Sequence, residues 1–208
     1  NTPIQINTLF YKSNDRDYNK EELNYMNKIC APKMINKITE NGRRTHIIIQ
    51  VLKKLLAQNR KILVLSDRRN HLTDIFNIIN SNKIATIGYY VGGMKQEDLK
   101  KSENNQILLG TYSMRSEGMD IPELNSVVFA SPKSDIIQSI GRILRKQHPE
   151  TPVAWDIVDD GIQIFKNQYK KRQSYYKKMK YNITNFYIED EIERPIEPFY
   201  SKLDHPSS

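Results

Sequence analysis

Apolar and polar residues alternate over the first twelve positions, "NTPIQINTLFYK", which predicts a β-strand there. Further along, the pattern changes to short continuous apolar runs, and every run except the one at 106–111 is followed by a polar loop and an amphipathic segment. The runs lie at residues 61–66, 85–93, 106–111, 126–131 and 152–159. Continuous runs of this length are typical of strands that are buried on both faces of a sheet.

Amphipathic segments with apolar residues three and four positions apart separate these runs. They predict helices over 45–58, 69–81, 95–102, 134–145 and 161–181. Helical pieces also fall between residues 19 and 42, interrupted at Pro32 and ended at Gly42. Strands that alternate with helices form right-handed crossovers, so we predict an α/β fold: a parallel sheet with helices on both faces. Ligands of such sheets bind at the carboxyl ends of the strands.

The chain divides into three parts on this pattern. Residues 1–44 form a strand and a helical segment leading into the main domain, which spans residues 45–183. Residues 184–208 are an acidic, proline-containing tail, which we expect to be poorly ordered or to dock elsewhere. Because residue 1 is Asn rather than Met, we expect the chain to be a piece of a longer protein.

Composition narrows the class of protein. The single cysteine, Cys30, excludes a disulfide framework, and no apolar run approaches the ~20 residues that a membrane span needs. We therefore expect an intracellular protein with no membrane partner. The four histidines are far apart in sequence, so we predict surface or capping roles for them and no metal site.

Positive charge is concentrated in one segment. The formal net charge is +8, and residues 166–180 contain seven Lys or Arg and no acid, which leaves +1 for the rest of the chain. Apolar side chains at helical spacing predict that one face of this helix packs on the sheet: Ile162, Phe165, Tyr169, Tyr176 and Met179. We favour a solvated outer face for the lysines, with phosphate binding as the alternative, in which Tyr175 could stack on a base.

The stretch "QSIGRILR", residues 138–145, combines permanent cations with apolar positions. In a helix, Gln138, Arg142 and Arg145 lie on one face, at positions i, i+4 and i+7. Isoleucine and leucine residues occupy the other face and can pack on a core. A planar pair of guanidinium groups suits phosphate or carboxylate oxygens, although spacing alone equally allows a solvated basic face.

Four ordered blocks resemble a known family. "TYSMRSEGMDIPELNSVVFASPKSDIIQSIGRILR" is similar to motifs V and VI of superfamily 2 helicases, "ILVLSDRRNHL" to motif IV, and "YYVGGMK" to the motif IVa region. The resemblance covers roughly residues 45 to 160. It looks closest to virus-encoded DNA helicases of the poxvirus transcript-release type and their asfarvirus counterpart, relatives of the XPB-like and UvsW-like helicases.

The resemblance implies the second of two RecA-like lobes. ATP with Mg²⁺ would be bound mainly by the first lobe, because this sequence contains no G-x-x-x-x-G-K-[ST] phosphate loop and no D-E-A-D-type box. By the family pattern, Arg142 and Arg145 reach the γ-phosphate across the cleft, and Gln138 orients the attacking water or binds a phosphate oxygen. Gly118 and Asp120 match positions that line the nucleotide side of the cleft.

Two acidic features have alternative explanations. Asp120 could instead form a turn before Pro122. Asp159 and Asp160 follow the last predicted strand and could mimic a magnesium-binding carboxylate. We favour a structural role for this pair, capping the helix that begins near Gly161, because a carboxylate is stabilised at a helix N-terminus.

The resemblance also implies contacts to a nucleic-acid strand. They fall in loops after the predicted strands and comprise Ser66, Arg68, Arg69, Gly92, Gly93 and Thr111. Hydroxyls, arginines and main-chain amides bind phosphate without reading bases. The alternatives are local: Arg68 or Arg69 could pair with Asp67 or Asp74, and Thr111 could be a cap.

Together these features predict the C-terminal lobe of an ATP-dependent DNA helicase or translocase that acts in viral transcription or DNA processing. Its partners would be DNA or RNA, the N-terminal lobe and the transcription machinery, in the host cytoplasm (a viral factory) or in the virion. We expect the lobe alone to be inactive as an ATPase. One alternative is a non-enzymatic RecA-like module that binds nucleic acid or protein. A small-molecule α/β enzyme would need a glycine-rich loop after the strand at 61–66, and "SDRRNH" has none.

Overall fold

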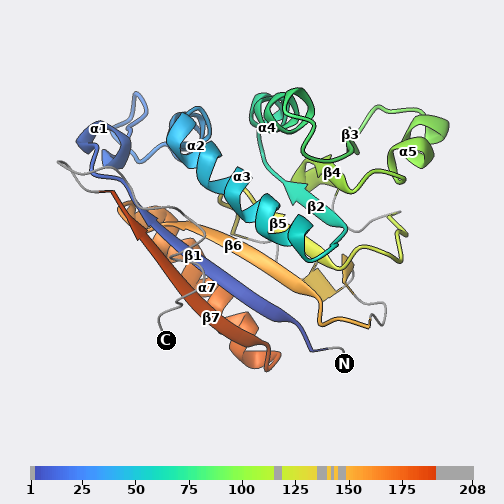
Figure 1. Cartoon of the computed structure of the whole chain (residues 1–208). Helices are drawn as coiled ribbons and strands as arrows, with labels where there is room; N and C mark the ends of the chain where they lie inside the picture. Colours follow the sequence, from blue (N-terminus) through green and yellow to red (C-terminus); the bar gives the residue numbers. More distant parts are fainter. Residues whose placement is uncertain (1–2, 115–118, 135–139, 142, 145–148, 191–208) are drawn as a thin grey trace.

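A computed structural model describes residues 3–114, 119–134, 140–141, 143–144 and 149–190. Within them lies a parallel sheet of seven strands in the order β3-β4-β2-β5-β6-β1-β7 (Figure 1). The strands are β1 (Gln5–Lys12), β2 (Ile62–Leu65), β3 (Ile87–Tyr89), β4 (Ile107–Gly110), β5 (Ser126–Phe129), β6 (Val153–Asp159) and β7 (Asn182–Glu189).

Helices connect these strands and cover both faces of the sheet. They are α1 (Arg16–Asn19), α2 (Ala31–Thr39), α3 (Gly42–Ala57), α4 (Arg69–Ser81), α5 (Gln96–Ser102), the 3₁₀ turn η1 (Tyr112–Met114) and α7 (Gln163–Lys178). Figure 1 shows α2, α3 and α4 in front of the sheet and α7 behind it. None of the helices in the described ranges is both long enough and apolar enough to cross a membrane.

Alternation along the strands builds two hydrophobic cores. In β2, Ile62 and Val64 join the core beneath α2, α3 and α4, whereas Leu63 and Leu65 join the core on the opposite face with α7. All four side chains are buried, which explains why the sequence shows a continuous apolar run here rather than an alternating one. The predicted α/β fold, with a parallel sheet and helices on both faces, is confirmed.

The sheet extends into both flanking segments. The strand predicted at the N-terminus, β1, lies inside the sheet between β6 and β7, and β7 falls mostly within the predicted tail. The sequence pattern does not predict β7, because its sequence "NITNFYIE" is half polar and its partner is far away in sequence. Only Phe186 and Ile188 of this edge strand are buried, so its apolar signal is short.

Two buried ion pairs join the helical layers to β6. On one face, the Arg44 guanidinium of α3 donates to the Asp159 carboxylate at 3.1 Å. On the other face, Arg172 of α7 forms a bidentate pair with Asp156, at 2.8 and 2.9 Å. Asp156 and Asp159 are three positions apart, so strand alternation places them on opposite faces. The Tyr176 hydroxyl also donates to Asp156, at 2.7 Å.

The predicted capping role of Asp159 is wrong. Its carboxylate accepts from Arg44 and from the Tyr18 hydroxyl, and the N-cap residue of α7 is Ile162, which makes no side-chain capping bond. Asp159 pairs with Arg44 instead of capping α7 because a fully buried guanidinium requires a charged partner, and Asp159 at the end of β6 is that partner. Asp159 thus belongs to the core of the domain.

We predict that Asp156→Asn lowers the free energy of unfolding by about 3–5 kcal/mol, because it leaves the Arg172 charge buried without a counter-charge. Urea unfolding followed by circular dichroism measures this loss. Glu189→Gln is the matched control, since Glu189 pairs with Lys12 at 3.9 Å on the surface, and should cost no more than about 1 kcal/mol. Equal losses from the two substitutions would contradict a structural role for the buried pair.

Candidate functional site

The loops that follow β2, β3, β4 and β5 lie at one edge of the sheet, because all these strands are parallel. We call this edge the carboxyl edge. The residues predicted to contact nucleic acid follow β2, β3 and β4 directly, so the fold brings them to this edge although they span 46 positions of sequence: Ser66, Arg68, Arg69, Gly92, Gly93 and Thr111. Asp120 is exposed in the segment that leads into β5.

The Ser66 hydroxyl is buried and is used within the protein. Its oxygen lies 2.9 Å from Nδ1 of His71 and accepts a hydrogen bond from the main-chain N–H of Arg68 at 3.2 Å. These contacts organise the turn between β2 and α4. A direct contact from Ser66 to a phosphate stays a prediction, and in this structure the hydroxyl has no exposed surface.

The prediction of a surface or capping role for His71 is wrong. Its ring is buried on α4, and burial, together with the nearby Arg44 charge, lowers its pKa to about 3. The sequence does not predict that this ring is buried, because histidine occurs on either face of a helix and the apolar neighbours of His71 in α4 do not show which face it occupies. The side chain is therefore neutral at physiological pH and acts as a hydrogen-bonding part of the core.

Arg68 joins the β2 loop to α2. Its Nε donates to the side chain of Asn36 at 2.5 Å, and one terminal nitrogen donates to the Pro32 carbonyl at 3.2 Å. The Asp67 group that it contacts is the main-chain carbonyl, whereas the Asp67 carboxylate pairs with Lys133 at 3.7 Å. The guanidinium remains partly exposed at the carboxyl edge.

Arg69 positions the glycine pair after β3. Its guanidinium donates to the Gly92 carbonyl at 3.0 Å, and both glycines are exposed. Gly93 has a φ of +88°, in a region that other residues rarely adopt, so glycine is needed there for conformation.

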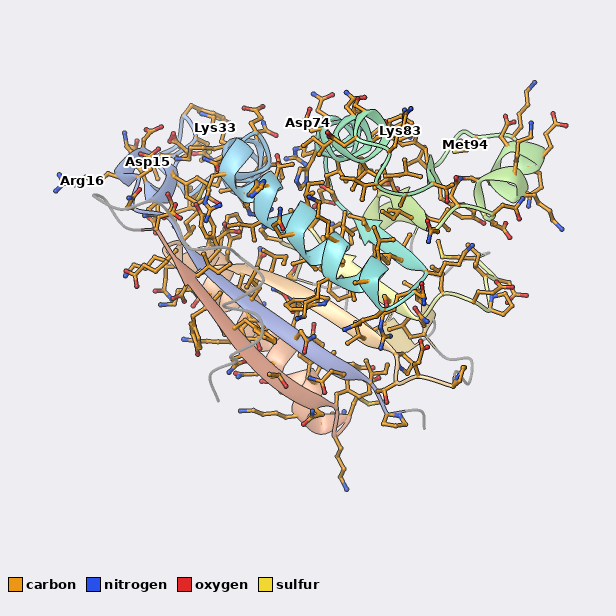
Figure 2. All side chains as sticks on the ribbon, viewed as in Figure 1. Asp15, Arg16, Lys33, Asp74, Lys83 and Met94 are labelled. Carbon is orange, nitrogen blue, oxygen red and sulfur yellow. The ribbon has the colours of Figure 1, made fainter. Side chains whose placement is uncertain are left out.

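A pocket of about 400 Å³ lies beside this loop and is lined by Arg69, Leu72, Thr73, Tyr89, Val91 and Met94. Figure 2 shows Met94 between α4 and α5.

Thr111 follows β4 and is partly exposed, and its hydroxyl shares a hydrogen bond of 2.8 Å with that of Ser113. The next residue, Tyr112, is buried and donates to the Ser131 carbonyl at 2.6 Å. The loop after β4 is thus connected to the loop after β5. Whether Thr111 also contacts a nucleic-acid phosphate stays a prediction.

The segment after β5, residues 130–134, is held from both faces of the sheet. Arg44 donates to the Ala130 carbonyl from the α3 side, and Arg172 donates to the Lys133 carbonyl at 2.7 Å from the α7 side. The Ser131 hydroxyl accepts from the main-chain N–H of Asp67 at 2.8 Å. These are the same guanidinium groups that form the ion pairs with β6, so the core fixes where the next segment begins.

That segment leads to "QSIGRILR". Its apolar residues Ile140, Ile143 and Leu144 are buried in the core on the α7 side, as the helical spacing predicts. A Cβ at Gly141 would lie 3.6 Å from the Tyr181 hydroxyl, which is ordinary contact. The predicted residues Gln138, Arg142, Arg145 and Gly118 lie outside the described residues.

Sequence reasoning missed the two arginines that organise this site. Arg172 falls within the apolar stripe of α7, three positions after Tyr169 and four before Tyr176. A cation in such a stripe is a signal for a buried charge that needs a partner. Arg44 gave no comparable signal, because it lies near the start of α3 and its partner, Asp159, is 115 positions away.

Comparison with known proteins agrees with this geometry. Residues 45–147 match the helicase conserved C-terminal domain family. A protein of Acanthamoeba polyphaga mimivirus, named as a candidate ATP-dependent RNA helicase, is 36% identical over 209 residues, covering 97% of this chain and 40% of that protein. A protein of Methanocaldococcus jannaschii with the same kind of name is 28% identical over 114 residues, covering 47% of this chain and 14% of that protein.

Solved structures show the same fold. The crystal structure of T4 UvsW superposes with a TM-score of 0.71 and 24% identity, covering 89% of this chain and 42% of that one. A yeast DEAD-box splicing factor superposes with a TM-score of 0.56 and 16% identity, covering 98% of this chain and 38% of that one. The chain thus spans about two fifths of the mimivirus protein and of UvsW.

The fold and the ordered loops define a RecA-like lobe of the helicase type. The chain belongs to the superfamily 2 helicases and corresponds to their C-terminal lobe.

We predict that His71 makes the lobe less stable in acid. Its folded pKa, about 3, lies below the unfolded value near 6.5, so its contribution to stability is complete above about pH 6.5 and is lost as pH falls toward 3. The loss should reach about 1.4 kcal/mol per pH unit within that window. Urea unfolding at several pH values should show a shallower decline for His71→Gln, and a far smaller change for the exposed-site control His46→Gln. Parallel curves for wild type and His71→Gln would contradict the burial of a neutral ring.

Proposed function

We propose that this chain is the second lobe of an ATP-dependent helicase or translocase, and that it supplies arginine side chains to ATP held by the first lobe. The observation that carries this proposal is the anchoring of residues 130–134. Buried guanidinium groups from both faces of the sheet fix the start of the segment that contains Arg142 and Arg145. An arginine that stabilises a transferring phosphoryl group must be positioned accurately, and this anchoring supports such a role.

The chemistry follows from charge. Phosphoryl transfer spreads negative charge over the oxygens of the transferring group, and a guanidinium placed there is worth roughly 10³–10⁵ in rate. Gln138 would orient the attacking water, and Gly118 and Asp120 would line the nucleotide side of the cleft. The preceding lobe would bind ATP and Mg²⁺, since this sequence has no phosphate loop.

The nucleic-acid strand would cross the carboxyl edge. Arg69, Gly92, Gly93 and Thr111 all present exposed or partly exposed surface there. Their chemistry suits phosphates rather than bases, as a protein that moves along a strand of any sequence requires. Arg68 is partly exposed beside them, and Ser66 would act indirectly by shaping the turn into α4.

We propose that the strand is DNA. RNA is the alternative that the experiment must test, because the mimivirus and Methanocaldococcus relatives are named as RNA helicases. The mimivirus relative supports a viral setting. Within that setting, we propose a role in transcription or DNA processing. ATP turnover by the full-length protein, stimulated separately by single-stranded DNA, duplex DNA and RNA, identifies the strand. Stronger stimulation by RNA than by either DNA would overturn the choice of DNA.

We predict that Arg142→Ala in the full-length protein lowers ATP turnover by about 10³-fold or more, because it removes a cation from the transition state. Nucleic-acid affinity should stay nearly unchanged, since the arginine serves the nucleotide. Steady-state ATP hydrolysis and fluorescence anisotropy with a labelled strand measure the two effects. Arg142→Lys keeps the positive charge but lacks the planar guanidinium with its paired N–H donors, so it should retain more activity than Arg142→Ala but less than the wild type. Turnover that survives Arg142→Ala would rule out the proposed arginine role.

We also predict that the isolated lobe hydrolyses no ATP, because the groups that bind the phosphates and the magnesium ion belong to the other lobe. Phosphate release by the purified 208-residue chain, with and without DNA, tests this. The full-length protein is the positive control. Activity that co-purifies with the lobe through repeated chromatography would contradict the prediction.

A further inference from the structure

The outer face of α7 carries only lysines and uncharged polar side chains. Its exposed or partly exposed lysines are Lys166, Lys170, Lys171, Lys177 and Lys178, which we call the lysine face. The helix contains no Asp or Glu. Solvated helices usually mix charges of both signs, so a face of one sign is an unusual concentration of positive potential.

The lysines form two rows along the helix. At about 100° per residue, Lys166, Lys170 and Lys177 fall within about 40° of one another, and Lys171 and Lys178 form a second row roughly 110° away. The polar residues between the rows are Gln163, Asn167 and Ser174. From Lys166 to Lys178 the face is about 18 Å long, which spans roughly five phosphates of one strand at the ~3.4 Å spacing along the axis of duplex DNA.

The inner face of α7 fixes the direction of the lysines. Phe165, Tyr169 and Tyr176 are buried in the core, and Arg172 is neutralised by Asp156. The seventh cation of the segment, Lys180, follows the end of the helix. Because α7 contains no Asp or Glu, the outward lysines have no counter-charge within the helix. The buried aromatic residues and the pairing of Arg172 with Asp156 also prevent the helix from rotating about its axis to bury the lysines.

The position of α7 connects the lysine face to the carboxyl edge. The helix begins just after β6 ends, at that edge, and runs back along the face of the sheet opposite α2, α3 and α4 (Figure 1). Lys166 is therefore nearest the carboxyl edge, and Lys178 is farthest from it. An exposed acid of the strand that follows α7, Glu189 of β7, is already paired with Lys12.

We propose that the lysine face binds the phosphate backbone of nucleic acid, as a second contact surface that continues from the carboxyl edge along α7. The binding is electrostatic and independent of sequence, because ammonium groups contact phosphates as point charges. This inference rests on the proposed function for its partner, but on α7 alone for its location.

The test uses the full-length protein with four lysines of the lysine face changed to Gln: Lys170, Lys171, Lys177 and Lys178. A matched control with the same change in net charge replaces four exposed lysines elsewhere with Gln: Lys28, Lys53, Lys100 and Lys101. Fluorescence anisotropy with labelled single-stranded and duplex DNA is measured over a series of sodium chloride concentrations. Circular dichroism and thermal unfolding show that both variants are folded.

We expect the affinity of the α7 variant at low salt to fall by more than about tenfold, and the slope of log affinity against log salt to become shallower. The slope changes by about 0.7–0.9 for each phosphate that is no longer neutralised, so four substitutions should change it by about 3. Changing the same four lysines to Arg should preserve the slope. The control variant should change the slope far less. Equal slopes for the α7 and control variants overturn the proposal.

Other anionic partners give different outcomes. If the α7 variant no longer binds an acidic polypeptide or anionic vesicles while its DNA binding is unchanged, the lysine face serves that partner and the proposal is wrong. ATP turnover without nucleic acid should be the same as in the wild type, since the proposal gives these lysines a role in nucleic-acid binding alone. Absence of ATP turnover in the wild-type protein itself would refute the proposed function, whereas unchanged DNA slopes refute only this inference.

Discussion

The lobe depends on two carboxylates of β6, each buried against a guanidinium from a helix on a different face of the sheet. A buried charge that loses its partner costs several kcal/mol, so α3 and α7 cannot shift along β6 without breaking these pairs. Each guanidinium also has N–H groups left over, and both groups donate to the segment after β5. The same two arginines therefore fix the helical layers on the sheet and the start of the segment that carries the motif arginines.

This arrangement separates arginines by role. Arg44 and Arg172 are buried and paired, and they belong to the fold. Arg68 and Arg69 lie at the carboxyl edge and hold neighbouring loops through carbonyl acceptors, with part of their surface still accessible. In a motor of two lobes, each lobe moves as a rigid unit while the contacts between them change. The buried pairs supply that rigidity in the part of the lobe that would face ATP.

The two proposed nucleic-acid surfaces share one structural cause. The loops of the carboxyl edge are brought together because the strands are parallel, and the lysines of α7 point outward because Arg172 and the aromatic residues hold its other face in the core. A backbone that crosses the edge and continues along α7 would meet positive charge without any base-specific contact. Such a surface suits a protein that moves along nucleic acid irrespective of sequence.

The sequence by itself determined the fold class, the strand at the N-terminus, the strands in the buried apolar runs, and the order of the loops, because apolar periodicity and motif spacing are local properties. It also placed Ile140, Ile143 and Leu144 on the buried side of their helix. Only the tertiary structure decided that β7 joins the sheet beside β1, that Asp159 pairs with Arg44, and that the ring of His71 and the hydroxyl of Ser66 are internal. These features depend on partners that are distant in sequence or on the depth of burial, and a buried charge is recognisable only when its counter-charge is found.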